Sequence, residues 1–146
     1  MELGHWRLAE GIQLNLSAFG FIYEITNNAT ERPKKYIGKK QCVFKVRKKP
    51  LKGKTRARLG VKESDWKTYT GSSKELNDDI KKYGKEMFDF VILEWCDSKF
   101  ELGYKEIKKQ IMEDVLLSED YYNGIINCRL GRVPKAFNTR ESKSIS

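Results

Sequence analysis

Two strand-like segments lie so close together in this sequence that they can pair in only one way. Residues 19–26 read FGFIYEIT and residues 35–41 read KYIGKKQ, and both are rich in the aromatic and β-branched residues that favour strands. Asn27-Asn28 between them is a turn signal. A parallel pair needs a crossover of about a dozen residues or more, and this connection is too short to supply one. The two segments therefore predict an antiparallel β-hairpin.

The later elements alternate between helix and strand. A helix is predicted from Lys74 to Tyr83, with a serine of Ser72-Ser73 as its cap and Gly84 at its end. Residues 87–96 read MFDFVILEWC, which is typical of a central strand. Residues 98–117 keep apolar residues at helical spacing. This order predicts an α+β fold, with a small antiparallel or mixed sheet flanked by helices.

The chain is expected to be a single domain. Its 146 residues suffice for one core, and no linker or internal repeat divides residues 1–146. The alternation of Ile12, Leu14 and Leu16 predicts a short strand before the hairpin. Residues 138–146 have the composition of a flexible tail.

Basic residues are concentrated in one stretch of the chain. The net charge is +9, yet residues 34–62 alone hold 13 Lys or Arg and no Asp or Glu. Within them, residues 42–62 are polar and interrupted by Pro50, Gly53 and Gly60, so we expect a flexible basic insertion and not a core element. Such a run can be a solvated loop or a targeting patch, but its density beside a folded hairpin favours a polyanion partner bound through phosphates.

The sequence lacks a membrane span, a signal peptide, paired cysteines and more than one histidine, and each of these absences excludes a class of protein or of site. No apolar run approaches a membrane span and residues 1–5 do not resemble a signal peptide, so we expect a soluble, cytoplasmic protein with no membrane partner. Cys42, Cys96 and Cys128 are widely spaced, and we expect reduced thiols and not disulfides or a zinc site. His5 is the only histidine, near a terminus where order is usually poorest. Any catalysis must therefore use Tyr, Lys, Arg, Glu, Asp or Asn.

Two tyrosine motifs in the predicted hairpin resemble those that define the GIY-YIG nucleases. Gly20-Phe21-Ile22-Tyr23 has Phe-Ile for Gly-Ile, and Tyr36-Ile37-Gly38 is intact. The features that follow in the family's order are a helix ending in Tyr83-Gly84, the strand FDFVILE, a helix with Glu106, and Tyr121-Tyr122-Asn123. The resemblance covers about residues 19–130. It implies a metal-dependent DNA endonuclease that hydrolyses phosphodiester bonds, with a three-stranded antiparallel sheet flanked by helices.

The resemblance implies one glutamate as the metal ligand, and Glu106 matches its position. Family members hold Mg²⁺ or a similar ion such as Mn²⁺ with a glutamate on a helix. Mg²⁺ suits a single carboxylate because it keeps most of its waters until phosphate oxygens arrive. Glu106 is next to Ile107 on the apolar stripe, which places it at the border of a cleft. Alternatively, Glu106 is one of several solvated acids on this helix.

The same resemblance makes Tyr23 the general base or the residue that positions the water, with Tyr36 holding water or phosphate. An unperturbed tyrosine has a pKa of about 10, so a cation must lower it. Lys39 and Lys40 follow the second motif directly. Alternation along a strand puts Tyr36 and Lys40 on one face, which favours Lys40 as the catalytic cation. Both lysines can instead be ordinary surface residues.

The family also uses an arginine on its first helix, and an asparagine that fixes the hydrogen bonds of the site. Arg47 has the right spacing from Tyr36 but lies in the interrupted basic stretch, so Arg56 or Arg58 can hold that role instead. Asn123 matches the asparagine, with Asn127 as an alternative.

Further contacts to nucleic acid are expected from the basic stretch and from two aromatic residues after it. Trp66 and Tyr69 can stack on unpaired bases, or they can be core residues. Trp66 and the sequence Tyr69-Thr70-Gly71-Ser72-Ser73 after a lysine-rich insertion are similar to a phage-encoded branch of the family, which would act in the host cytoplasm. The basic residues expected to contact DNA are Lys39, Lys45, Lys48, Lys49, Lys52, Lys54, Arg56 and Arg58.

Two other functions fit the same composition. A basic module on a nuclease-like fold can bind DNA or RNA without cutting it, and a scaffold can use its basic arm for protein partners. The nuclease hypothesis alone gives a reason for Tyr23, Tyr36, Glu106 and Asn123 to occur together. The sequence does not reveal cleavage specificity, and double-strand breaks from one small site would need two visits or a homodimer on DNA.

Overall fold

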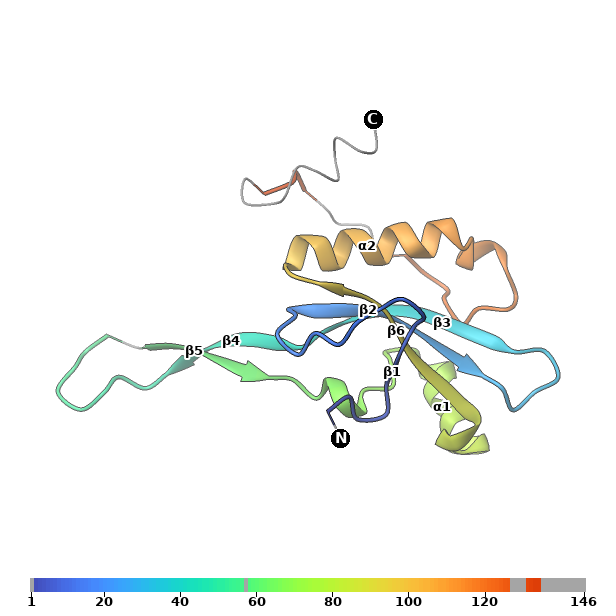
Figure 1. The fold of residues 1–146 in the computed structure, drawn as a ribbon, viewed down its shortest axis with the longest axis horizontal. Coiled ribbons are helices and arrows are strands. Elements are labelled where there is room, and N and C mark those ends of the chain that lie inside the picture. The colour runs from blue at the N-terminus through green and yellow to red at the C-terminus, as the bar shows by residue number, and fades with distance from the viewer. Residues whose placement is uncertain (1, 57, 127–130, 135–146) are drawn as a thin grey trace.

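A mixed β-sheet forms the centre of the computed structural model, which describes residues 2–56, 58–126 and 131–134 (Figure 1). Strands β2 (Gly20–Asn27), β3 (Lys34–Gln41) and β6 (Phe88–Cys96) are antiparallel, and β1 (Arg7–Leu8) pairs in parallel with β6. Among the described residues the strand order is β1-β6-β2-β3, so β3 lies at an edge. The predicted antiparallel hairpin and the α+β fold are confirmed.

Two helices lie on opposite sides of the sheet (Figure 1). Helix α1 (Lys74–Tyr83) begins where the Ser73 side chain accepts a hydrogen bond from Leu76 N, and it ends at Gly84, as predicted. Helix α2 (Lys99–Met112) is shorter than expected, because Asp114 takes a left-handed backbone conformation and leads into the 3₁₀ turn η3 (Val115–Leu117). Two more 3₁₀ turns, η1 (Trp66–Thr68) and η2 (Lys85–Met87), precede α1 and β6.

Alternating side chains of the strands separate two hydrophobic cores. Ile22 and Ile37 face α2, where they pack with Leu102 and Val115. Phe21, Tyr23 and Ile25 face the other side, and this larger core also contains Trp6, Trp66, Leu76, Phe88, Phe90 and Ile92. Burying each large apolar side chain stabilises the fold by about 1.5–3 kcal/mol. The sheet is therefore held between α2 on one side and the N-terminal segment with η1 and α1 on the other.

The N-terminal segment is ordered differently from the prediction. Leu14 and Leu16, expected in a strand, are exposed, and the only strand before β2 among the described residues is the two-residue β1. Trp6 accounts for this, because its ring is buried and its Nε1 donates a 2.6 Å hydrogen bond to Trp66 O. That anchor holds the neighbouring residues, and not those at 12–16, beside β6. His5 is packed as well, with its ring stacked 4.0 Å from that of Phe90.

The basic stretch is not an irregular insertion. It forms a second, two-stranded antiparallel sheet from β4 (Val43–Lys48) and β5 (Arg58–Glu63), which extends away from the main sheet (Figure 1). Pro50 and Gly53, which suggested an interrupted chain, lie in the connecting loop, while β-branched residues and Phe44 favour the strands. Cys42, the first residue of this stretch, is buried in the larger core and Val43 packs against it, whereas the described side chains from Phe44 to Lys62 lie outside both cores, as expected. The flexible tail predicted at 138–146 lies outside the described residues.

Cys42 and Cys96 are free and buried, as expected of reduced core thiols, whereas Cys128 lies outside the described residues. Burial raises the pKa of the Cys42 thiol to about 12, so it stays protonated at neutral pH. None of the described helices has the length and apolar character needed to cross a membrane.

The environment of His5 predicts acid sensitivity of the fold. Its Nε2 lies 2.9 Å from Tyr69 O, whereas its buried Nδ1 has no partner in the described part of the chain. Burial, and then the charge of Lys85, lower the pKa of His5 from 6.5 to about 4. Because the unfolded state binds this proton more tightly, stability present above pH 6.5 is lost as the pH falls towards 4.

We therefore expect the Tm of the wild type to fall more steeply between pH 7 and pH 4 than that of His5→Phe, which keeps a ring beside Phe90. Thermal unfolding followed by circular dichroism measures both profiles. Only the difference in slope matters, because the lost hydrogen bond to Tyr69 O shifts the Tm of the variant at every pH. Parallel profiles would contradict the proposed role of His5.

Candidate functional site

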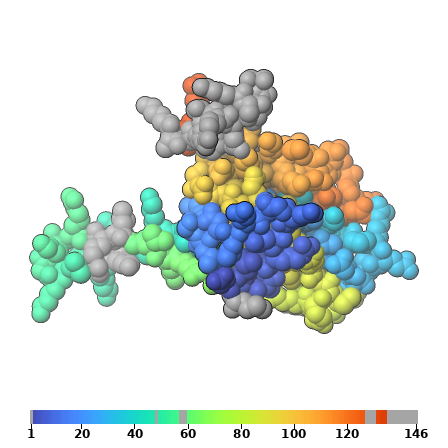
Figure 2. Space-filling view, viewed as in Figure 1, coloured from blue at the N-terminus to red at the C-terminus, as the bar shows by residue number. Residues whose placement is uncertain are grey.

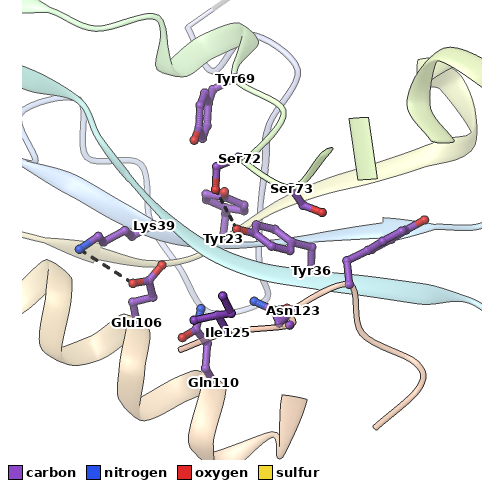
Figure 3. Close-up of a pocket in the computed structure, with 12 residues that line it drawn as sticks. Tyr23, Tyr36, Lys39, Tyr69, Ser72, Ser73, Glu106, Gln110, Asn123 and Ile125 are labelled. Atoms are coloured by element: carbon purple, nitrogen blue, oxygen red, sulfur yellow. Dashed lines mark hydrogen bonds and ion pairs between the residues drawn. The ribbon is translucent and has the colours of Figure 1, made fainter. Parts of the chain in front are cut away.

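A pocket of about 590 Å³ lies beside the edge strand β3 (Figure 3). Its wall takes residues from both faces of the sheet, because the pocket wraps around the edge. The lining residues are Tyr23, Tyr36, Lys39, Tyr69, Ser72, Ser73, Glu106, Gln110, Tyr122, Asn123, Gly124 and Ile125. Four of the six predicted catalytic residues are therefore together in one place, namely Tyr23, Tyr36, Glu106 and Asn123.

The edge of β3 explains why the C-terminal segment reaches this pocket. Every second N–H of an edge strand points away from the sheet and needs a partner. Lys35 N donates to Asp120 O and Tyr122 N donates to Lys35 O, each at 2.7 Å, as in a short parallel bridge. These bonds bring the segment that contains Asn123 alongside the strand.

Asn123 continues this pairing with its side chain. Ile37 N donates to Asn123 Oδ1 at 3.1 Å, and Asn123 Nδ2 donates to Ile37 O at 2.8 Å. Gln110 Nε2 donates to the same carbonyl oxygen at 2.9 Å. Asn123 is buried, so its amide is fully engaged in holding β3 and is a positioning residue in this arrangement. Asn127, the alternative, lies outside the described residues.

The third outward N–H of the edge, that of Lys39, is bound by the carboxylate of Glu106. Lys39 Nζ also lies 3.9 Å from Glu106 Oε1, and only 17% of the Glu106 side chain is exposed. Burial raises the pKa of Glu106, and the charge and the backbone N–H of Lys39 offset part of that rise. Glu106 is thus not one of the solvated acids of α2 but a desolvated carboxylate at the wall of the pocket.

Gln110 was missed in the sequence, although a signal for it existed. It lies four residues after Glu106, so both side chains project from the same face of α2. Once Glu106 is taken to face a cleft, the residue at i+4 is expected at the same wall. Ser72 and Ser73 were recognised as helix-capping candidates but not as pocket residues.

The two tyrosines are neutral phenols in this structure. Tyr23 is 1% exposed, and burial raises its pKa well above 10, with the charges of Tyr36, Tyr69 and Glu106 acting in the same direction. Burial also raises the pKa of Tyr36, whose hydroxyl lies 3.1 Å from Ser72 Oγ. The expectation that a lysine beside Tyr23 lowers its pKa is not met, because burial and the neighbouring charges all raise that pKa.

Two glycines make room for the phenol of Tyr23. A Cβ at Gly38 would lie 2.5 Å from Tyr23 Oη and 2.7 Å from its Cζ, far inside contact distance. Gly71 has a φ of +86°, and a Cβ there would lie 3.3 Å from the same oxygen. The glycines of the Tyr-Ile-Gly and Tyr-Thr-Gly-Ser-Ser sequences thus let β3 and the loop before α1 close around one hydroxyl group.

Lys39 and Lys40 lie on opposite faces of β3, as strand alternation predicts. The lysine that lines the pocket is Lys39, and not Lys40 as expected. Lys40 shares the face of Tyr36, where its Nζ lies 2.7 Å from Asp65 Oδ1 and 4.0 Å from the centre of the Tyr69 ring. Lys39 points to the α2 face and lines the pocket beside Glu106 (Figure 3). The preference for Lys40 assumed a site on one face of the sheet, whereas the pocket spans the edge.

The arginine expected on the first helix does not lie on one. Arg47 is an exposed residue of β4, and among the described residues no arginine lines the pocket. Arg56 is exposed in the loop between β4 and β5, and the side chains of Lys48 and Arg58 are outside the described part of the structure. Helix α1, the first helix after the hairpin, reads KELNDDIKKY and contains no arginine.

The two aromatic residues after the basic stretch have different environments. Trp66 is 4% exposed and packs in the larger core, and its Nε1 donates to Glu63 Oε1 at 3.0 Å. Its ring is therefore a core ring, and the alternative that it stacks on bases is wrong. Tyr69 is half-buried and lines the pocket opposite Tyr23 and Tyr36.

Comparison with known proteins agrees with this architecture. The family model described as "Putative endonuclease segE, GIY-YIG domain" matches residues 10–126, which is most of the chain and includes every residue of the pocket wall. No curated relative and no solved structure matches the chain. On the match to this family model, the chain belongs to the GIY-YIG endonuclease family.

Proposed function

We propose that this protein is a divalent-metal-dependent endonuclease that hydrolyses phosphodiester bonds of DNA. The observation that carries the proposal is the position of Glu106, the one carboxylate on the described pocket wall, opposite Tyr23 and Tyr36. Membership of an endonuclease family supports a nuclease in general, and the run of basic residues at 34–62 supports a nucleic-acid substrate.

The donor set fits Mg²⁺ or Mn²⁺ better than a metal that needs several protein ligands. Among the described residues no group of three His, Cys, Asp or Glu side chains is arranged to hold a metal. Mg²⁺ is commonly bound by one or two carboxylates, with waters and substrate phosphate as the other ligands. Glu106 would be its protein ligand, and the ion, when bound, supplies Lewis-acid stabilisation of the phosphate charge.

The residues of the pocket take distinct parts in this proposal. Tyr23, as a neutral phenol, orients the attacking water by a hydrogen bond and does not remove its proton, which passes to solvent, while the leaving oxygen takes a proton from solvent. The Tyr36 hydroxyl, held near Ser72, contacts the phosphate. Lys39 adds a positive charge beside the phosphate. The bound phosphate and Glu106 then compete for the ammonium group of Lys39. Asn123 and Gln110 keep β3 in place through Ile37.

The direct test is nicking of a supercoiled plasmid by wild type and by Glu106→Gln in MgCl₂, with EDTA as the metal control. A metal contributes several kcal/mol to such transition states, and about 1.4 kcal/mol corresponds to tenfold in rate. We therefore expect Glu106→Gln to lose cleavage by about 10²-fold or more, while binding to the plasmid persists. Absence of cleavage by the wild type with every divalent ion tried would end the enzyme proposal.

Glu106→Gln is also expected not to lower stability. Because burial raises the pKa of Glu106 in the folded state, its ionisation opposes folding, and stability present below the ordinary pKa is lost as the pH rises. At pH 7 in EDTA the Tm of Glu106→Gln should equal or exceed that of the wild type, and the difference should narrow towards pH 4. MgCl₂ should raise only the wild-type Tm. A variant clearly less stable than wild type at pH 7 would contradict the desolvation of Glu106.

Lys39→Gln and Lys40→Gln form a matched pair that separates the two faces of β3. A charge-assisted hydrogen bond is worth about 1.5–3 kcal/mol, so Lys39→Gln should reduce cleavage by about 10- to 100-fold. Lys40→Gln removes the same charge from the ion pair with Asp65 and should change the cleavage rate by less than about threefold. Plasmid-nicking rates at saturating protein measure both. The reverse ranking would restore Lys40 as the catalytic cation.

A non-catalytic module that binds DNA or RNA on the same fold is the second candidate. It is favoured by the raised pKa values of Tyr23 and Tyr36 and by the lack of an arginine on the described pocket wall. In that case Glu106→Gln leaves binding and biological effect unchanged, and the plasmid assay separates the two candidates. If double-strand breaks form, their dependence on protein concentration distinguishes a homodimer on DNA from two visits by one protomer.

A further inference from the structure

The segment from the start of β4 to Lys62, one residue before the end of β5 at Glu63, carries as much positive charge as the net charge of the whole chain. Residues 43–62, here called the basic ribbon, contain nine Lys or Arg and no Asp or Glu, so the net charge of +9 leaves the rest of the chain neutral. None of the catalytic roles proposed above requires these residues. The basic ribbon therefore needs a function of its own.

Side chains on both faces of the basic ribbon are exposed. The ribbon extends from the body of the protein (Figure 2), and Phe44 and Lys45, which project to opposite faces, are both exposed. Phe44 is 40% exposed, Leu51 53% and Val61 66%. A partner that covers the ribbon must therefore accept a few apolar contacts as well as a high positive charge.

Cationic side chains lie on both faces of the ribbon, so a partner that neutralises them must contact both faces. Residues directly opposite in an antiparallel pair share a face, and the register pairs Lys45 with Val61 and Phe44 with Lys62. Lys45 and Lys62 thus project to opposite faces, with Arg47 on the side of Lys45. A flat anionic surface, such as a membrane, would satisfy one face only. A groove with phosphates along both walls satisfies both.

The dimensions of a two-stranded ribbon select one groove. Paired strands lie about 4.8 Å apart, with side chains projecting to either side. The major groove of B-DNA, about 12 Å wide, admits such a ribbon without distortion, whereas the undistorted minor groove, about 6 Å wide, does not. The major groove of duplex RNA is too deep and narrow for side chains to read.

The base of the ribbon is fixed to the strand that forms the pocket. Only Cys42 separates β3 from β4, and its N donates to Phe19 O at 2.7 Å while Ser64 N donates to its carbonyl at 2.8 Å. Ser64 Oγ donates to Gln41 O at 2.6 Å. Lys39 at the pocket and Val43 at the start of the ribbon are four residues apart, so at most about 13 Å separates them, with a bend of the chain at Cys42 between the two strands.

We propose that the basic ribbon inserts into the major groove of duplex DNA and so sets which phosphodiester, a few nucleotides from the inserted ribbon, reaches the pocket. The inference deepens the proposed nuclease function, but it concerns binding and can be tested without cleavage. Exposed residues of the loop contact phosphates on the groove walls, and the strands present Lys45, Arg47 and Lys62 to the groove.

The first test measures affinity by fluorescence anisotropy for a labelled DNA duplex of about three helical turns, with full-length Glu106→Gln in EDTA. In this background, Lys52→Gln, Lys54→Gln and Arg56→Gln together remove three exposed charges of the ribbon. A matched control, Lys81→Gln, Lys99→Gln and Lys108→Gln, removes three exposed charges from the helices. Unchanged circular dichroism confirms that both variants are folded.

We expect the ribbon variant to bind at least 10-fold more weakly, and its slope of log K against log salt to fall by up to about 2.7, or 0.9 for each lost phosphate contact. The control should stay within about threefold of its parent. Equal losses of DNA affinity in both variants would overturn the inference, because any positively charged surface of the protein would then contribute equally to binding.

The second test identifies the groove. Methyl green, which occupies the major groove, should displace the protein from the duplex, whereas netropsin in the minor groove should not. Duplex RNA of the same sequence should bind with no difference between the ribbon variant and its control. Competition by netropsin alone, or an equal ribbon-dependent affinity for duplex RNA, would overturn the proposal. If these results hold and the wild type never cleaves, the nuclease proposal fails and the ribbon inference stands.

Discussion

The exposed edge of β3 is the constraint on which the rest of the site depends. An edge strand presents alternate N–H groups that must be paired, and here Lys35, Ile37 and Lys39 are paired by three different devices: a backbone carbonyl, the amide of Asn123 and the carboxylate of Glu106. Each device draws another part of the chain to the same edge. Closing the edge therefore also assembles the pocket, with α2 on one side and the Tyr121–Asn123 segment on the other.

Assembly at this edge buries polar groups, and burial favours their neutral forms over their charged forms. Tyr23 gains stability from burial among aromatic rings but keeps its proton to well above neutral pH. Glu106 is held near Lys39 yet is disfavoured as an anion by its burial. The negative charge of Glu106 is desolvated and is only partly offset by Lys39. A divalent cation bound with a phosphate would supply the missing positive charge. The free energy that the fold gives up at Glu106 is what such a ligand could recover.

One short stretch of chain, from β3 to β4, links the proposed chemistry to the proposed binding of DNA. β3 carries Tyr36 and Lys39 and continues through buried Cys42 into the basic ribbon. The neutral charge of the remaining chain means that long-range attraction of a polyanion acts through the ribbon. Membership of the GIY-YIG family accounts for the sheet and the paired tyrosines. The ribbon is the part of this chain that would orient a duplex relative to them.

Local signals in the sequence determined the hairpin, α1 with its Ser73 cap, the central strand β6 and the concentration of positive charge, because each depends on residues close together in the chain. The family resemblance added Tyr23, Tyr36, Glu106 and Asn123 as one set, and the structure brings them together. Only the tertiary structure decided that Lys39 and not Lys40 meets Glu106, that Trp66 is a core ring, that Trp6 places β1, and that the basic stretch is a ribbon. These outcomes depend on which face, edge or partner each residue meets across the sheet, and periodicity along a single strand carries no information about that.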